Sequence, residues 1–410
     1  MFYLKKILKK IFNLCRIPSL VKLFAKKAPP LKKGGINLVG YFNAPIGTSE
    51  VGRQCFLDTT KHSELAVKVI SYELDSYEKQ EITTNQDFAP WISEKYIYDT
   101  NIFFFNADSI EPFMNHYVPQ KNESYNVGVF WWELEDYFYF DKGVNAPDEI
   151  FVFSDFIKQA IIKNYPNKIV TKFSLPYYLP NYKFDTTTTV RKRYGFSDDS
   201  FIFFFNFDFY SVYERKNPEG LVKAFAKAFK GNPNAILLLK TIHGNKHLSN
   251  FNKFQQLLSD YDIANQVVII DKNMEKIELM NLLNASNCYV SLHRAEGLGI
   301  GMMEAMLLKK PVIATAYGGN MEFTNIETSL LVKYDIIQIG EGNEPYKKNY
   351  TWANPDIDDA SSKMTEIYHN IELRNRLSEN GYNYIISNHS NGKFSNELST
   401  WLGKNKNIKK

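Results

Sequence analysis

The segment from residue 291 to residue 322 constrains the fold of this chain more than any other stretch. It starts at the end of an apolar strand, passes through a loop with Gly297, Gly299 and Gly301, continues as a short helix, and ends in a strand over residues 312–315. The glycines permit close backbone approach, so free N–H groups at the positive helix start can face an anion. The segment therefore predicts an α/β domain.

Two glutamates bracket these glycines. Glu296 lies on the loop, and Glu304 lies about one turn into the helix, so both side chains can reach one cleft. A plain glycine loop with solvated glutamates is the alternative for such a pattern. The strand Lys-Pro-Val-Ile-Ala-Thr that follows, together with the paired carboxylates, favours a ligand site.

Length and composition predict two folded domains. A chain of 410 residues is too long for one ordinary core, and 44% hydrophobic with 15% aromatic residues exclude a disordered chain. The three cysteines, Cys15, Cys55 and Cys288, are widely spaced and odd in number. They suggest neither a disulfide framework nor a zinc site, which favours a reducing cytoplasm.

The net charge of +4 hides an uneven distribution. Residues 1–33 contain ten Lys or Arg and no acid, and the tail from Lys404 adds four more Lys. The rest of the chain has 35 Lys and Arg against 45 Asp and Glu, so the body is acidic. A nucleic-acid-binding domain would carry its basic surface on the fold itself, and that class is not expected here.

Residues 1–35 are predicted to form a basic amphipathic helix and a linker. Apolar side chains recur at spacings of three and four as far as Cys15, lysines lie mostly on the other side, and Pro18 breaks the pattern. The apolar runs are too short to span a membrane, and no signal-peptide core leads to a cleavage site. We expect residues 1–33 to bind an anionic membrane surface; a solubilising arm or a docked helix is the alternative.

Residues 36–185 are predicted to form a first Rossmann-like domain. The loop with Gly47 after the first strand is either a phosphate-binding loop or a plain tight turn. Trp132 and Glu133 follow a strand where parallel sheets bind ligands, although a buried Trp pair beside a surface Glu explains them equally well. Ser154 is expected to cap a helix. The expected strands cover residues 36–42, 67–72, 101–105, 126–131, 149–153 and 172–175.

Residues 186–388 are predicted to form a second Rossmann-like domain, because residues 176–190 lack periodicity and contain prolines. Arg215 and Lys216 stand at a helix start, where cations are disfavoured, which suggests a phosphate-binding role rather than a solvated pair. Lys240 ends a buried strand. Further strands are expected over residues 201–205, 267–271 and 329–332.

These motifs resemble retaining glycosyltransferases of the family 4 type, a bacterial subgroup in particular. Glu296 and Glu304 match the motif of two glutamates separated by seven residues, and the resemblance covers roughly residues 36–401. One departure is Tyr210, which stands where the family commonly has Arg. The other matching motifs are the Gly47 loop, Trp-Trp-Glu-Leu at 131–134, Arg-Lys-Asn-Pro at 215–218, Gly-Gly-Asn-Met-Glu at 318–322 and Trp-Ala-Asn-Pro-Asp at 352–356.

The resemblance implies a GT-B fold, in which two Rossmann-like domains face each other across a cleft. The second domain would hold a nucleotide-sugar, the first would hold the acceptor, and residues 389–410 would form a helix that crosses back to the first domain. No metal and no cofactor are implied. The implied site residues are Glu296, Arg215 and Lys216 for catalysis, Glu304, Gly297, Gly299, Gly301, Lys240 and Gly47 for the donor, and Glu133 and Trp132 for the acceptor.

The expected activity is retaining transfer of a hexose, such as mannose, to a growing bacterial surface glycan: an O-antigen of lipopolysaccharide, a capsule or an exopolysaccharide. The acceptor would be a glycan or a lipid-linked glycan at the cytoplasmic face of the inner membrane, with other glycan-assembly enzymes as further partners. A nucleotide-sugar epimerase or a phosphorylase on the same fold is one alternative. A non-catalytic membrane-bound scaffold is the other.

Overall fold

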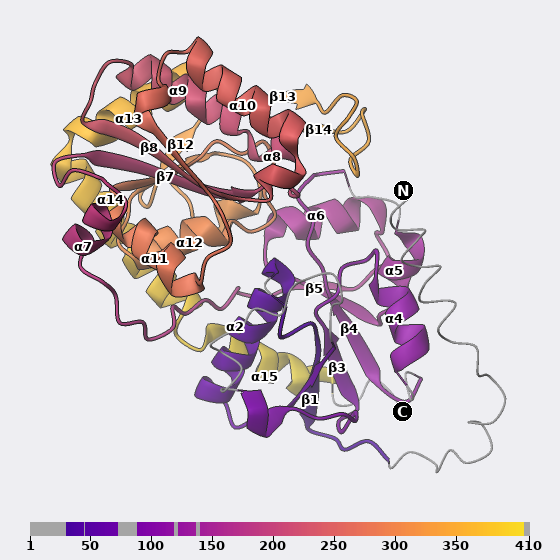
Figure 1. Cartoon of the computed structure of the whole chain (residues 1–410). Coiled ribbons are helices and arrows are strands. Elements are labelled where there is room, and N and C mark those ends of the chain that lie inside the picture. The colour runs from indigo at the N-terminus through magenta and orange to yellow at the C-terminus, as the bar shows by residue number, and fades with distance from the viewer. Residues whose placement is uncertain (1–29, 45, 73–87, 119–121, 137–139, 406–410) are drawn as a thin grey trace.

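The computed structural model of this chain shows two α/β domains, each built around a six-stranded parallel sheet (Figure 1). A separate two-stranded antiparallel hairpin extends from the second domain. The predicted amphipathic helix falls within residues 1–29, which lie outside the described residues. The structure describes residues 30–44, 46–72, 88–118, 122–136 and 140–405.

The first sheet has the strand order β2-β1-β3-β4-β5-β6. Its four inner strands are buried almost throughout, as parallel strands covered on both faces by helices should be, whereas the edge strands β2 and β6 are partly exposed. All six strands expected in this part of the chain are present, with bounds that differ by a few residues. They are β1 (Gly35–Gly40), β2 (Ala66–Ser71), β3 (Thr100–Phe103), β4 (Tyr125–Val129), β5 (Glu149–Val152) and β6 (Val170–Lys172).

An amide ladder crosses this sheet. Asn37 Nδ2 donates to Asn101 Oδ1 at 2.7 Å, and Asn101 Nδ2 donates to Asn126 Oδ1 at 2.9 Å. Buried amides would destabilise the sheet without partners, so the ladder explains why polar side chains interrupt β1, β3 and β4. It also favours one alignment of these strands.

The helices of the first domain connect its parallel strands. Ser154 Oγ accepts a hydrogen bond from Ile157 N at 3.2 Å, which confirms Ser154 as a helix N-cap. The helical elements are α2 (Gly47–His62), η2 (Ala89–Trp91), α4 (Ile110–Tyr117), α5 (Asp141–Asn145) and α6 (Asp155–Asn164).

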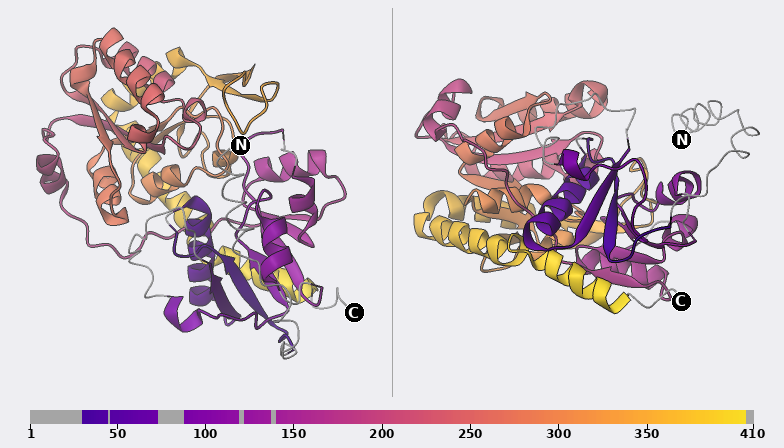
Figure 2. Two further views of the ribbon diagram at one scale, coloured as in Figure 1. Left: turned by 45° about the vertical axis from the view of Figure 1, so that its right-hand side comes forward. Right: turned by 90° about the horizontal axis from the view of Figure 1, so that it is seen from below.

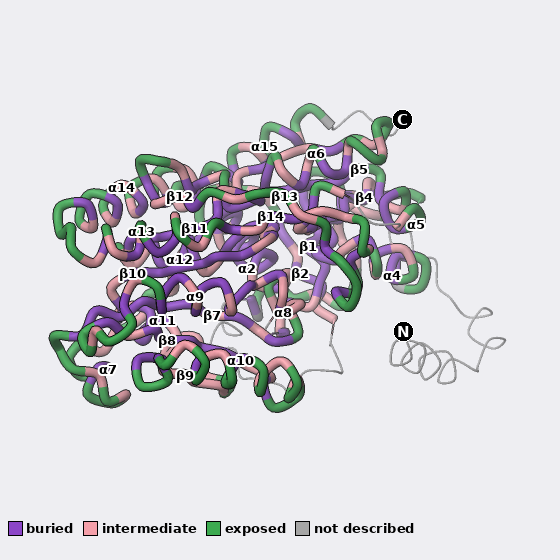
Figure 3. Tube along the Cα trace, turned by 90° about the horizontal axis from the view of Figure 1, so that it is seen from above, coloured by how far each residue is buried: buried purple, intermediate pink, exposed green. Residues whose placement is uncertain are grey.

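The second sheet has the order β12-β11-β10-β7-β8-β9. Figure 3 shows its strands as buried cores beneath helices whose outer faces are exposed. The strands are β7 (Phe201–Asp208), β8 (Ala235–Ile242), β9 (Val267–Asp271), β10 (Cys288–Ser291), β11 (Val312–Thr315) and β12 (Leu330–Val332). The helices are α7 (Thr187–Arg193), α8 (Tyr213–Lys216), α9 (Pro218–Phe229), α10 (Leu248–Asp260), α11 (Lys276–Ala285), α12 (Ile300–Leu307), α13 (Ile357–His369) and α14 (Ile371–His389), with short 3-10 turns η3 (Gly244–Lys246), η4 (Ala264–Gln266) and η5 (Gly319–Glu322).

Local expectations for the second domain need correction at two places. Helix α7 begins inside the segment expected to lack structure, because Thr186 Oγ1 caps it by accepting from Thr189 N at 3.2 Å. Arg215 lies in the one-turn helix α8 rather than at the start of α9. Glu304 is the fifth residue of α12, about one turn into the helix as expected.

The motif at residues 352–356 lies in a hairpin and at the helix start that follows it. The strands β13 (Tyr334–Gln338) and β14 (Thr351–Pro355) pair antiparallel. Asp356 follows β14 and caps α13, since its Oδ1 accepts from Asp358 N at 2.8 Å.

The C-terminal helix α15 (Lys393–Asn405) packs on the first domain beside α2. Figure 2 shows α14 and α15 running in sequence from one domain to the other. Trp401 Nε1 donates to both oxygens of the buried Glu149 at 3.1 Å, and Ser395 N donates to Asp58 at 2.8 Å. The chain thus crosses between the domains a second time. No helix of the described ranges is long and apolar enough to span a membrane.

Candidate functional site

The carboxyl ends of both parallel sheets face the boundary between the domains, the edge where open α/β sheets bind ligands. Arg215 lies shortly after β7, Glu296 after β10 and Lys276 after β9. From the first domain, Glu133 comes after β4 and Glu50 comes from α2 after β1. Segments that are distant in sequence therefore meet at one place.

A cluster of two cations and two carboxylates forms the centre of this site. Lys216 Nζ lies 2.6 Å from Glu296 Oε2, and Arg215 Nη1 lies 3.8 Å from the same oxygen. Arg215 Nη2 lies 3.9 Å from Glu133 Oε1 of the first domain. The three residues predicted for catalysis are thus neighbours, and one residue predicted for the acceptor joins them across the boundary.

Backbone contacts fix the relative positions of α8 and the loop after β10. Arg294 N donates to Arg215 O at 2.8 Å, and Asn217 Nδ2 donates to Leu292 O at 2.8 Å. Asn217 adopts a left-handed conformation and also caps α9 through Gly220 N. The Asn after Arg-Lys in the predicted motif is therefore the residue that joins the two segments.

Burial and ion pairing act in opposite directions on these charges. Burial raises the pKa of Glu296, but Lys216, Arg215 and His293 outweigh it and lower this pKa to about 2. Burial lowers the pKa of Lys216, and Glu296 partly restores it. Burial also disfavours charged Arg215, yet Tyr346, Glu133 and Glu296 raise its pKa above the ordinary value.

Arg215 keeps hydrogen-bonding capacity within this cluster. Its Nη1 donates to Ala295 O at 3.1 Å, while its buried Nε has no hydrogen-bond partner in the part of the chain that the structure describes. An unpartnered buried donor is costly, so a further acceptor would stabilise the site. The guanidinium can therefore take an oxyanion without losing its existing backbone bond.

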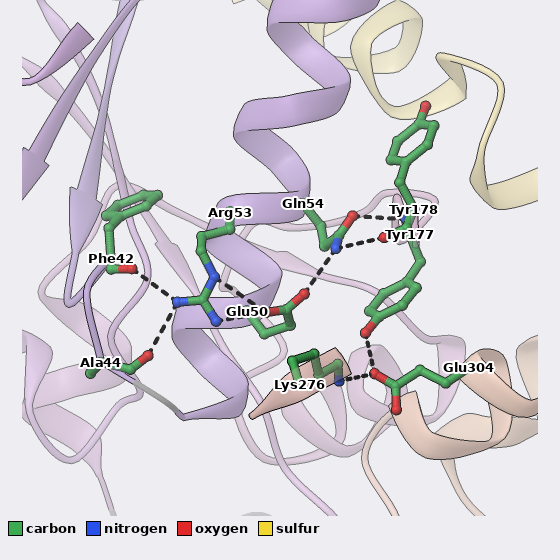
Figure 4. Close-up of polar contacts among 9 residues, drawn as sticks. All are labelled: Phe42, Ala44, Glu50, Arg53, Gln54, Tyr177, Tyr178, Lys276 and Glu304. Carbon is green, nitrogen blue, oxygen red and sulfur yellow. Dashed lines mark hydrogen bonds and ion pairs between the residues drawn. The ribbon is translucent and has the colours of Figure 1, made fainter. Parts of the chain in front are cut away.

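Glu304 belongs to a second polar network, drawn in Figure 4. Its Oε1 accepts from the hydroxyl of Tyr177, in the segment between the domains, and from Lys276 Nζ at the start of α11. Across the boundary, Glu50 binds Arg53 at 2.6 Å and Gln54 at 2.8 Å. Burial raises the pKa of Glu50, but Arg53 and then Lys276 lower it below its ordinary value, so the networks of the two domains interact electrostatically.

The glycine loop lies directly against the first domain. Gly299 has φ of +82°, a conformation that side chains rarely adopt, and it precedes the first residue of α12. A Cβ at Gly297 would lie 3.0 Å from the carbonyl oxygen of Trp132. Gly301 is in the first turn of α12. Gly297 thus meets the predicted acceptor segment at Trp132.

The Gly47 loop is held by the first domain itself. Gly47 is the first residue of α2, and Arg53 Nη1 donates to Phe42 O at 2.9 Å and Ala44 O at 3.1 Å (Figure 4). These bonds fix the chain entering the helix. A Cβ added to Gly47 would meet nothing within 4 Å.

Two other predicted site residues have partners within their own domains or at the domain boundary. Lys240 Nζ donates to Thr241 O at 2.8 Å and Lys272 O at 2.6 Å, and burial lowers its pKa to about 8. Trp132 is buried, donates from Nε1 to Asp136 O at 2.7 Å, and packs edge-on against Tyr346. These contacts fit the alternative interpretation, in which Trp132 is a buried side chain beside Glu133.

Three site residues were not singled out from the sequence. Lys276 is the first residue of a helix, a position where cations are disfavoured. The same observation suggested a phosphate-binding role for Arg215, and it could have identified Lys276 as well. Tyr177 lies in a segment without period, and Tyr346 lies in the connection of an unexpected hairpin, where its hydroxyl donates to Glu133 at 3.4 Å. No pattern in the sequence marks these two tyrosines.

A family model and a curated relative match parts of this chain. Residues 187–384 match the family model described as Glycosyl transferases group 1. An uncharacterized glycosyltransferase of Methanocaldococcus jannaschii is 29% identical over 160 residues, which cover 38% of this chain. The match spans 37% of the archaeal protein, little more than a third of its length.

Solved structures share the architecture of the chain at low sequence identity. HepE of Anabaena, solved with UDP and glucose, has a TM-score of 0.64 and 14% identity, covering 91% of this chain and 99% of HepE. Sucrose-phosphate synthase of Thermosynechococcus elongatus has a TM-score of 0.63 and 14% identity, covering 90% and 98%. TarM of S. aureus, in a complex that includes UDP, has a TM-score of 0.52 and 16% identity, covering 75% and 54%. These likenesses confirm the predicted GT-B fold.

The Glu296 cluster predicts a specific acid sensitivity. The folded-state pKa of Glu296 is about 2 and the ordinary value is 4.5, so its contribution to stability is present above about pH 4.5 and is lost as the pH falls toward 2. A shift of this size corresponds to about 3 kcal/mol at neutral pH. As the pH is lowered from about 7 to about 3, the thermal unfolding temperature should fall more steeply for the wild type than for Glu296→Gln. Glu341→Gln, at an exposed position, should follow the wild type; parallel curves for all three proteins would contradict the ion-pair account.

Proposed function

We propose that the protein is a retaining hexosyltransferase that uses a nucleotide-sugar, because residues 187–384 match the glycosyl transferases group 1 family model. The observation that carries the proposal is the convergence of Arg215, Lys216 and Glu296 opposite Glu133 at the domain boundary. Group transfer from a nucleotide-sugar requires stabilisation of a leaving diphosphate, and buried cations at fixed positions are suited to that task.

The donor half of the proposed site lies in the second domain. Arg215, Lys216 and the N–H groups near Gly299 would bind the diphosphate and stabilise the negative charge that develops on it, without requiring a metal ion. Glu296 would accept hydrogen bonds from hydroxyls of the transferred sugar, and Glu304 would accept from the ribose. Binding of the diphosphate would therefore have to loosen the present contact between Lys216 and Glu296.

A UDP-linked hexose is the first donor to test. Two structures with this fold, HepE and TarM, were solved with UDP, and HepE also holds glucose. GDP-mannose is the second donor to test, because mannose is the example of a transferred hexose given in the sequence analysis. The proposed acceptor is a growing surface glycan or a lipid-linked glycan, bound beside Glu133 and Trp132.

The place of action that we propose is the cytoplasmic face of the inner membrane. The basic segment of residues 1–33 supports this proposal, since a lipid-linked acceptor would require the site to remain close to an anionic surface. Other enzymes of glycan assembly would then be near neighbours.

Transfer should depend on the central cluster. With radiolabelled UDP-glucose or GDP-mannose and a bacterial glycolipid extract as acceptor, Glu296→Ala and Lys216→Ala should each lower transfer by about 100-fold or more. Lys309→Ala removes an ion pair between two exposed side chains, Lys309 and Glu379, and should transfer at the wild-type rate. Undiminished transfer by both cluster variants would rule out the site. Release of an epimerised donor, or of a sugar phosphate in the presence of phosphate, would indicate an epimerase or a phosphorylase instead.

Membrane attachment should depend on the first 29 residues. Deletion should stop there, because Lys32 N and O bond to Ile97 and Asp99 of the folded domain. The shortened protein should no longer sediment with phosphatidylglycerol vesicles, since each basic residue near such a surface contributes about 1 kcal/mol. Neutral phosphatidylcholine vesicles serve as the control. Equal sedimentation of both proteins with anionic vesicles would contradict the membrane role.

A further inference from the structure

Glu304 is held at only one of its two carboxylate oxygens. The hydroxyl of Tyr177 and the ammonium of Lys276 both donate to Oε1, and within the described residues no hydrogen bond reaches Oε2. Figure 4 shows this second oxygen pointing away from both donors. The carboxylate therefore has a fixed orientation and one oxygen free to accept a hydrogen bond.

Tyr177 supplies the first of these contacts from a rigid position. It is fully buried, its N donates to His389 O at 2.7 Å, and its carbonyl accepts from the hydroxyl of Ser390. The two crossings of the chain between the domains therefore meet at this residue. Burial, and then Glu304, raise the pKa of the Tyr177 phenol well above its ordinary value, so the hydroxyl remains a donor.

Lys276 supplies the second contact, to the same oxygen. Its side chain is 36% exposed, whereas that of Glu304 is 3% exposed, so the ammonium reaches a buried carboxylate from the solvent side. Burial opposes the charge of Lys276, but Glu304 and Glu50 outweigh it and raise its pKa. A cation in the first turn of a helix is disfavoured by the helix dipole, and the two carboxylates offset that cost.

We propose that Tyr177 and Lys276 are positioning residues that hold Glu304 so that its free oxygen accepts a ribose hydroxyl of the bound nucleotide. This inference rests on the proposed function and assigns two residues to its donor site. The two contacts on Oε1 fix the orientation of the Glu304 carboxylate and direct its Oε2 away from both donors.

Ribose discrimination tests the proposal, because it measures hydrogen bonding to the ribose separately from overall stability. We would measure the affinity of the full chain for UDP and for its 2′-deoxy and 3′-deoxy analogues by calorimetry. The wild type should prefer UDP over at least one analogue by about tenfold or more, as expected for a hydrogen bond to a charged group. Tyr177→Phe and Lys276→Met should reduce this preference to about threefold or less, while Lys276→Arg should retain most of it.

Matched controls separate positioning from general damage. Tyr194→Phe breaks another tyrosine–carboxylate contact, with Glu278, and Lys272→Met removes another lysine that pairs with Glu278. Both should keep the wild-type preference for UDP. Thermal unfolding of each variant checks that it is folded, and the comparison of Lys276→Met with Lys276→Arg still decides the question if Tyr177→Phe does not fold.

Several outcomes would overturn the proposal. If the folded variants Tyr177→Phe and Lys276→Met keep the wild-type preference for UDP over its deoxy analogues, neither residue positions Glu304. Tighter UDP binding by Lys276→Met would show that Lys276 competes with the ribose for Glu304. If the same substitution weakens the affinity for UDP more than the affinity for UMP, Lys276 binds a phosphate group instead. If the wild type binds none of UDP, GDP and ADP, the proposed function fails together with this inference.

Discussion

The site depends on one constraint: charged groups that are withdrawn from water at the domain boundary must be paired. Arg215 and Lys216 approach Glu296, Arg215 also approaches Glu133, and Lys276 contacts Glu304. Removing one member of such a pair leaves an uncompensated buried charge, which is strongly destabilising. Carboxylates and cations therefore pair with each other at the domain boundary. An anionic ligand would bind there by replacing the carboxylate partners of the cations with its own oxygen atoms.

The same boundary is also where the chain passes between the domains. Tyr177 lies in the first crossing and contacts the end of α14, which leads to the second crossing, while α15 is docked on the first domain through Trp401 and Ser395. The phenol of Tyr177 also donates to Glu304, so this carboxylate contacts the connection between the domains.

Much of the architecture could be predicted from the sequence, because buried parallel strands leave continuous apolar runs and their carboxyl ends gather at one edge. The proximity of Arg215 and Lys216 to Glu296 followed from that rule together with the family resemblance. Tyr177 could not be predicted, since its role depends on where an irregular segment passes in space. The backbone partners of Lys240 could not be predicted either, since they depend on how the segment after the neighbouring strand β9 folds back.

A crystal structure of the full chain with UDP would test the central claim most directly, because it locates the nucleotide relative to both networks. The account predicts the ribose against the free oxygen of Glu304 and the diphosphate against Arg215 and Lys216, with the contact between Lys216 and Glu296 lengthened. A nucleotide bound away from these residues, with both ion-pair networks unchanged, would contradict the account.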